Sequence, residues 1–172
     1  MKAVVALAVV LYSPLAFASL PIPTTLKELA QCADHILVGH VVAVDMIDGS
    51  GRQIEDKNAR TGPGLKNTIR LHVTVDEVLV TNAGEVSKLL KVPLDPFMHY
   101  SLGQIEAAHA KPSEAFLVLL KGPSFLPIVP GAFLRSMDEK ETALRMHAQR
   151  NQSRADAGEE KKATKDCKPA AD

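Results

Sequence analysis

The stretch that decides the fold is residues 36–44, which read ILVGHVVAV. Apolar residues fall on both faces of this run when it is extended, which is typical of a strand buried on both sides. Gly39 interrupts the run, and a glycine inside a strand indicates a bulge or a sharp bend. We therefore expect a buried first strand whose geometry is irregular near Gly39.

A short helix is expected just before this strand. Residues 25–28 read Thr-Leu-Lys-Glu, the pattern of a capping box in which the threonine and the glutamate satisfy each other's free backbone N–H groups. The following apolar residues recur at helical spacing on one face: Leu26, Leu29, Ala30 and Ala33. The pattern predicts a helix of two to three turns that ends near Asp34.

More strands are expected downstream. Residues 68–75 alternate strictly, with Ile69, Leu71, Val73 and Val75 inward and Arg70, His72 and Thr74 outward. This alternation predicts a half-buried strand, which continues through Val80. Further strands are predicted at 86–92, at 115–121, the most hydrophobic segment after the N-terminal one, and at 131–134.

The segment 45–67 joins the first two strands. It contains two clusters of turn residues, at 48–51 and 61–64, among charged residues. A connection of about 20 residues exceeds the usual loop length, so we interpret it as functional, mobile or a floppy hairpin.

The C-terminal part differs in composition. Ser136-Met137-Asp138-Glu139 has the pattern of a second capping box, which predicts a helix over 136–150. Residues 151–172 contain no large apolar residue, so they cannot offset the entropy of ordering, and we expect them to be a disordered polar tail. Deleting this tail should leave the melting temperature nearly unchanged.

The elements together define a fold class. A chain of 172 residues fits one domain, and five short strands with a helix beneath them predict a mainly β protein built as a small closed barrel. We expect the barrel domain over 19–135, with an N-terminal helix inside it and the C-terminal helix after it.

Three segments carry a resemblance to known proteins. Residues 26–44, 69–79 and 114–120 resemble small secreted bacterial proteins of unknown function, and their arrangement is similar to the OB-like barrel of netrin and tissue metalloprotease-inhibitor domains. The resemblance covers roughly residues 24–134 and implies a five-stranded OB-like barrel. Such inhibitors chelate a protease zinc through an N-terminal cysteine. The mature residue expected here is Ser19, so only the fold carries over.

Residues 1–18 have the features of a cleaved signal peptide. Lys2 is followed by a short apolar segment, and Ala16-Phe17-Ala18 places small residues where a signal peptidase reads them. The segment is shorter than the about 20 residues of a spanning helix. Residues 29–32 imitate a lipobox, but Gln31 is a poor residue before a modified cysteine. We expect export to the periplasm or the medium, with no membrane span after signal removal.

Composition limits the partners. Lys plus Arg and Asp plus Glu both number 20, and a zero net charge gives no case for a nucleic-acid partner. The two cysteines exclude a dense disulfide framework. Export permits a Cys32–Cys167 bond, but Cys167 lies in the expected tail. We therefore expect that the two cysteines do not form a fixed structural disulfide.

No catalytic, cofactor or metal residue is assigned. Zinc ligands usually occur as close pairs, and none of the six histidines forms one, so we interpret them as scattered surface residues, although His40 and His72 could approach each other. They are His35, His40, His72, His99, His109 and His147. Asp76 and Glu77 are adjacent on a strand, so they should face opposite sides and cannot act jointly on one bond. Nucleophile motifs and phosphate-binding glycine loops are absent from the sequence.

Two functional hypotheses remain. The first is an exported, non-enzymatic binding or accessory module for an unknown protein or small molecule, with the barrel face and the 45–67 segment as its contact surface. The second is an exported hydrolase whose site is scattered along the sequence. A concave site that gathers titratable groups would favour the enzyme.

The mature protein is predicted to begin at Ser19. Cleavage after Ala18 follows from the small residues at positions 16 and 18. N-terminal sequencing of the exported protein should read Ser-Leu-Pro-Ile; an intact Met1 in exported material would contradict this prediction.

Overall fold

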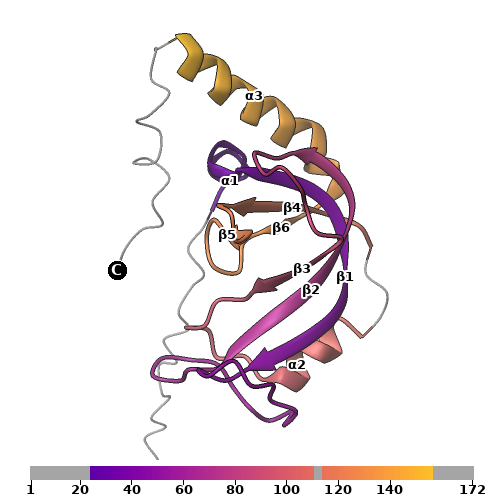
Figure 1. Cartoon of the computed structure of the whole chain (residues 1–172), viewed down its shortest axis with the longest axis vertical. Coiled ribbons are helices and arrows are strands. Elements are labelled where there is room, and N and C mark those ends of the chain that lie inside the picture. The colour runs from indigo at the N-terminus through magenta and orange to yellow at the C-terminus, as the bar shows by residue number, and fades with distance from the viewer. Residues whose placement is uncertain (1–23, 111–113, 157–172) are drawn as a thin grey trace, which may run out of the picture.

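A computed structural model describes residues 24–110 and 114–156, and these form one open antiparallel sheet of six strands with three α-helices (Figure 1). The strands are β1 (His35–Ile47), β2 (Thr68–Val80), β3 (Leu89–Pro93), β4 (Phe116–Lys121), β5 (Leu126–Pro127) and β6 (Leu134–Arg135). The helices are α1 (Leu26–Cys32), α2 (Leu102–Ala108) and α3 (Lys140–Asp156), and a 3-10 turn, η1 (Met137–Glu139), precedes α3. In the part of the chain that the structure describes, no helix is long and apolar enough to cross a membrane.

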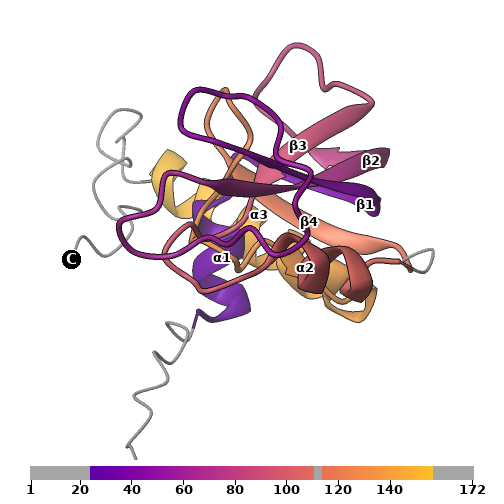
Figure 2. The ribbon, with the colours of Figure 1, turned by 90° about the horizontal axis from the view of Figure 1, so that it is seen from below.

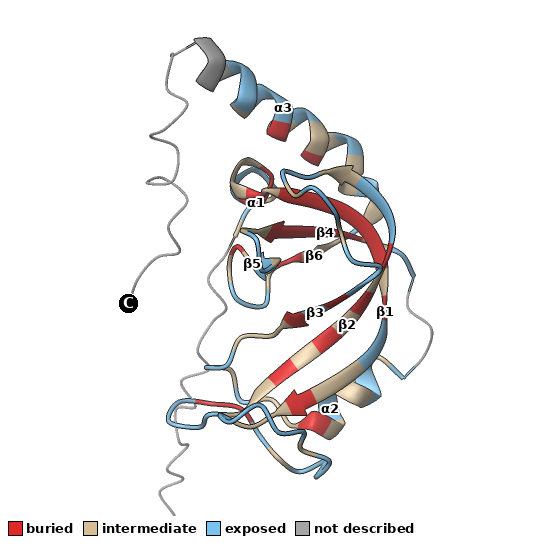
Figure 3. Ribbon diagram, in the orientation of Figure 1, coloured by how far each residue is buried: buried red, intermediate tan, exposed pale blue. Residues whose placement is uncertain are grey.

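β1 lies in the middle of the strand order β3-β2-β1-β4-β5, and β6 also pairs with β4. Its first residues, 35–39, pair with β4 on one side, while nearly its whole length pairs with β2 on the other. The expected burial on both faces is confirmed for residues 36–39 but is wrong for residues 40–44, where Val42 and Ala43 are exposed (Figure 3). The pairing slips between Val38 and Gly39, which confirms the expected irregularity.

The core lies against the inner face of β2. Ile69, Leu71, Val73 and Val75 are buried and the residues between them are more exposed, which confirms the predicted alternation. The main cluster joins this face to β1, β3, β4 and Phe133. The mainly β class is therefore correct.

The number of strands differs from the expectation of five. The segment between 122 and 135 supplies two very short strands rather than one. β5 folds back on the end of β4 after Gly122, whose positive φ of 71° suits a tight turn, and β6 pairs with Leu117 and Val118. Prolines in this segment remove N–H donors, which keeps both strands short.

The two expected capping boxes have different outcomes. At α1, the N–H of Glu28 donates to Thr25 Oγ1 over 3.2 Å and the N–H of Thr25 donates to the Glu28 carboxylate over 2.9 Å, so that box is confirmed. The second is wrong: Ser136 accepts from the N–H of Asp138, and Glu139 pairs with Arg135 instead of reaching back. The chain therefore enters α3 through the 3-10 turn η1.

Side chains of α3 donate hydrogen bonds to carbonyl groups at the C-terminal end of α1. The last carbonyls of a helix have no partner within it. His147 donates from Nδ1 to the Ala30 carbonyl over 3.0 Å, and Arg150 donates to the Ala33 carbonyl over 3.3 Å. Asn151 in turn donates to His147 Nε2 over 3.2 Å. These contacts hold α3 across α1 (Figure 1).

The expected boundary of the disordered tail at residue 151 is wrong. Residues 151–156 continue α3, and Asn151 bonds a buried histidine. Deleting residues 151–172 would remove that bond, so the reason for expecting an unchanged melting temperature no longer holds. The remainder of the expected tail, 157–172, lies outside the described residues.

Cys32 takes part in a disulfide bond, so the expectation that it is not bonded is wrong. Within one chain the sequence offers a single partner, Cys167, which lies outside the described residues. The expectation rested on the place of Cys167 in the expected disordered tail, which would lose conformational entropy on closing a loop of about 135 residues. The contacts of α3 with α1 already close most of that loop. About 11 residues then remain between Asp156 and Cys167, enough to span ~36 Å when extended.

Replacement of Gly39 by alanine should destabilise the protein. An added Cβ would lie under 3.0 Å from the carbonyl oxygen of Thr74, a backbone atom that cannot move aside. We expect Gly39→Ala to lower the free energy of unfolding by about 2–4 kcal/mol. Gly84→Ala is the matched control, since nothing lies within 4 Å of its added Cβ, and it should change stability by less than about 0.5 kcal/mol. Equal effects in urea denaturation would contradict the role given to Gly39.

The disulfide of Cys32 is expected to be intramolecular. Proteolysis of the oxidised, mature protein without reductant should release one linked peptide pair containing Cys32 and Cys167. The pair should separate on addition of dithiothreitol, and the intact protein should run as a monomer in non-reducing gels. A disulfide-linked dimer, or two free thiols under denaturant, would contradict this assignment.

Candidate functional site

The outward side chains of β1, β2 and β3 form one surface, which we call the sheet face. The strand register arranges them in three rows: His40, Thr74 and Leu89; Ala43, His72 and Lys91; and Asp45, Arg70 and Pro93. Val42 is an extra residue of β1 where the pairing slips, and it is exposed beside the middle row. Because three paired strands carry these side chains, their relative positions are set by the backbone ladder.

Asp45 is the centre of a charged cluster on the sheet face. Arg70 donates to both carboxylate oxygens, from Nε over 2.8 Å and from Nη2 over 2.6 Å. His72 Nε2 lies 2.9 Å from Oδ2, although its ring N–H is not aligned for a hydrogen bond, and Lys91 Nζ lies 3.8 Å from the same oxygen. The Asp45 side chain is only 10% exposed. Three basic groups therefore surround one nearly buried carboxylate, which we call the Asp45 cluster.

The ionisation of this cluster follows from its contacts. Burial by itself raises the pKa of the Asp45 carboxyl, but the hydrogen bonds and charge of Arg70, together with the charge of His72, outweigh burial and hold that pKa below its usual range. The hydrogen bond to Asp45 raises the pKa of Arg70. Both groups are charged at neutral pH, and with Lys91 the cluster carries one positive charge in excess before His72 is counted.

His40 and His72 both lie on the sheet face, but each has a carboxylate of its own. His40 Nδ1 lies 3.0 Å from Asp76 Oδ2, while His72 faces Asp45. The two histidines lie in neighbouring rows of the sheet face, since His40 pairs with Thr74, two residues after His72 on β2. Residues 24–110 and 114–156 contain no group of three or more His, Cys, Asp or Glu placed to hold a metal ion.

Asp76 and Glu77 point to different partners. Asp76 meets His40, and Glu77 accepts from Lys140 of α3 over 2.9 Å. The pairing between β1 and β2 skips Asp76, because Val38 pairs with Glu77 and Gly39 with Val75. This bulge turns the Asp76 side chain toward the sheet face.

The interpretation of all six histidines as surface residues is wrong for two of them. His147 is buried between α1 and α3, as described above. His35 is fully buried, stacked near Phe125, with Nε2 2.9 Å from the Gly122 carbonyl and Nδ1 2.8 Å from Thr81 Oγ1. Because a carbonyl only accepts, Nε2 donates to Gly122, and Nδ1 shares a hydrogen bond with the threonine hydroxyl. Both histidines connect segments that are far apart in the sequence.

The remaining histidines flank α2. His99 lies over Gly62, close enough to fill the space that a side chain there would need. His109 ends α2, and burial lowers the pKa of its imidazole. Neither touches the Asp45 cluster in any contact of the described residues.

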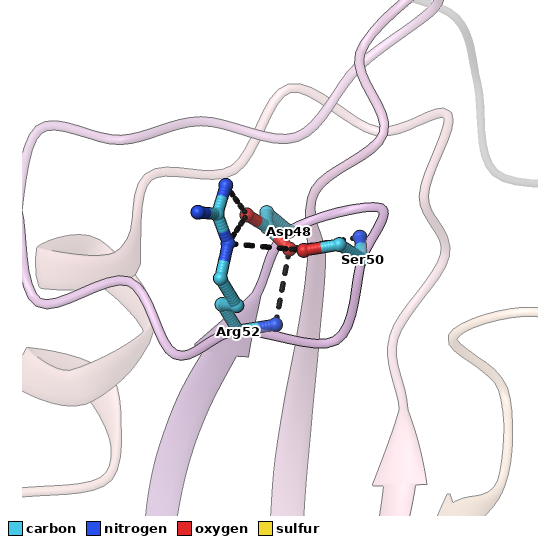
Figure 4. A network of polar contacts seen from close by, with 3 residues as sticks. All are labelled: Asp48, Ser50 and Arg52. Carbon is cyan, nitrogen blue, oxygen red and sulfur yellow. Dashed lines mark hydrogen bonds and ion pairs between the residues drawn. The ribbon is translucent and has the colours of Figure 1, made fainter.

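The segment after β1 is organised around Asp48. Its carboxylate accepts from the backbone N–H groups of Ser50 and Arg52, from the Ser50 hydroxyl and from the Arg52 guanidinium (Figure 4). Hydrogen bonds, the Ser50 hydroxyl first among them, hold the pKa of this carboxyl far below its usual range. Residues 48–52 therefore form a tight turn, as the Gly-Ser-Gly pattern indicates.

Residues 48–67 are anchored along their length, and we call them the long loop. The loop lies beside α2 at one end of the molecule (Figure 1, Figure 2). The N–H groups of Leu102 and Gly103 donate to carbonyls of the loop, Lys57 pairs with Glu106, and Thr61 exchanges bonds with residues 98 and 100. Ser101 and Gln104 form a capping box at the start of α2. The long loop is thus a packed element of the fold.

The sequence pattern did not single out Asp45, the centre of the cluster. Asp45 was assigned to the connection after the first strand, but β1 continues to Ile47. The outward positions of Arg70 and His72 were correct. The alternation of β1 could have placed Asp45 in the strand, because Asp45 faces outward and the next residue, Met46, is buried on the opposite side.

Comparison with known proteins finds no family model and no curated protein that matches the chain. The chemistry of the sheet face therefore has to be judged from its own residues.

Replacing Asp45 tests the energetics of the cluster. Asp45→Asn leaves Arg70 and Lys91 without their counter-charge, and we expect a loss of about 1–3 kcal/mol at pH 7. Because the folded-state pKa of Asp45 is lowered, its contribution is present above the unfolded-state pKa, about 3.9, and is lost as the pH falls through the lower folded-state value. Denaturation curves should therefore converge for wild type and variant below about pH 4. A difference that stays constant down to pH 2 would contradict the assignment.

Proposed function

We propose that this chain is an exported, non-enzymatic binding or accessory module on an OB-like barrel. Its contact surface is the sheet face together with the long loop. Its partner is a protein or small molecule outside the cytoplasm.

The strand arrangement supports the OB-like barrel. An OB fold is a five-stranded, partly open Greek-key barrel. The order β3-β2-β1-β4-β5 fits such a barrel unrolled between β3 and β5, and α2 lies between β3 and β4 along the chain. The two end strands of that order, β3 and β5, also approach each other in space. β6 is an addition to this plan.

Export is supported by the disulfide and by the first residues. Disulfides persist mainly in oxidising compartments outside the cytoplasm, and Cys32 is disulfide-bonded. Residues 1–18 lie outside the described part of the chain, and their sequence pattern carries the assignment of a signal peptide.

The observation that carries the binding hypothesis is the anchored long loop with exposed apolar side chains at the same end. Leu65 in the loop is 50% exposed and Phe97, next to the segment that holds the loop, is 63% exposed. A loop that is already ordered loses little conformational entropy on binding, so contacts made by its side chains convert efficiently into affinity. Large aromatic and aliphatic side chains supply much of the energy of protein interfaces.

The test is quantitative capture by the mature protein. Immobilised residues 19–172 would be incubated with extracytoplasmic extract of the source cells, and bound proteins and small molecules would be quantified by mass spectrometry. We expect Leu65→Ser with Phe97→Ser to reduce capture at least tenfold. The matched control is Leu126→Ser, which removes a similarly exposed leucine on β5.

The outcomes separate binding from its alternatives. Capture retained by the control and lost by the double variant supports the proposed surface. Equal capture by all three proteins, or none by the wild type, contradicts it. Circular dichroism must show the same fold for each variant.

A further inference from the structure

We propose that the Asp45 cluster binds carboxylate groups of an acidic protein segment. This inference rests on the proposed binding function and names the chemistry of the partner. The observation behind this inference is that several basic groups surround one carboxylate on an ordered sheet.

The first step is the charge of the cluster. A cross-strand ion pair needs one cation for one carboxylate, and the two bonds from Arg70 already satisfy Asp45. Lys91 and His72 also face the same oxygen, at 3.8 and 2.9 Å. Asp76 and Glu77 lie farther along β2 and have other partners, since Asp76 meets His40 and Glu77 meets Lys140. Within the described residues, Asp45 is the one carboxylate at ion-pair distance from Arg70, His72 and Lys91, so these basic groups outnumber their acidic partner.

Some hydrogen-bond donors of the cluster remain available to a ligand. Asp45 takes Nε and Nη2 of Arg70, which leaves Nη1 outside this fork. The Lys91 side chain is 48% exposed, so its ammonium group can turn toward a ligand. Lys91 and Arg70 lie on adjacent strands, in neighbouring rows of the sheet face. A ligand carboxylate placed over His72 would meet donors from two strands.

The surroundings of the Asp45 cluster favour a polypeptide ligand over a free phosphate or a nucleic acid. Asp45 occupies the bidentate fork of Arg70 that either a phosphate or a carboxylate could use, so a ligand here depends also on the groups around the cluster. Val42 on β1 and Leu89 on β3 are exposed, and both lie next to the middle row on the side of His40. Apolar side chains beside a cationic centre suit an acidic segment that also carries apolar residues. The balanced overall charge of the chain gives no electrostatic case for a nucleic acid.

The test uses defined probes and the full mature protein. An acetylated peptide, Glu-Leu-Glu-Gly-Glu-Leu-Glu, would be titrated into ¹⁵N-labelled residues 19–172. Its control peptide has glutamine at every glutamate, and inorganic phosphate forms a third arm. Amide shifts should cluster on β1, β2 and β3, and binding should weaken as salt is raised.

Two charge-reversal variants locate the interaction. Lys91→Glu should weaken peptide binding at least tenfold. Lys27→Glu makes the same change of net charge at an exposed position of α1, and binding should stay within twofold of wild type. Matching amide spectra away from the substitution would show that both variants fold.

Each other result overturns the inference. Equal binding of the glutamine peptide would mean that carboxylates are not recognised, and the same shifts with phosphate alone would mean a general anion site. Equal weakening by Lys27→Glu would mean attraction by net charge only. No binding of the acidic peptide would also overturn it. Cellular capture that persists in Lys91→Glu would leave the proposed binding function intact while removing this assignment.

Discussion

The close approach of β1 to β2 at Gly39 is the constraint on which the rest of the sheet depends. β1 pairs with β4 only up to Gly39 and then continues with β2 alone, so it must change direction there. The absence of a Cβ lets the carbonyl of Thr74 occupy the space that a side chain would fill. One strand can therefore serve as the central strand at one end and as part of an outer ribbon at the other.

The sheet face and the long loop are consequences of this arrangement. Beyond Gly39 one side of β1 and β2 faces the core and the other faces outward, so polar residues collect there in register. The bulges that accompany the bend leave Asp76 and Val42 out of the regular pairing and move them toward this surface. The same ribbon carries the long loop to α2, where backbone bonds hold it.

At the other end of the molecule, polar side chains connect helices that have little apolar surface of their own. α1 has only seven residues, and a helix this short depends on tertiary contacts. His147 and Arg150 satisfy its last carbonyls, while Leu29 and Ala30 pack against the cluster that contains Ala143. The disulfide at Cys32 adds a covalent link at the same place.

The sequence by itself determined the elements whose causes are local: the α1 capping box, the alternation of β2, the irregularity at Gly39 and the mainly β class. These follow from side-chain spacing and backbone preference within a few residues. Only the tertiary structure decided that Asp45, Arg70, His72 and Lys91 meet, that His147 completes α1, and that the long loop is anchored. Those contacts join residues 25 to 117 positions apart. Strand register and helix packing bring them together, and neither is encoded within a few residues of the sequence.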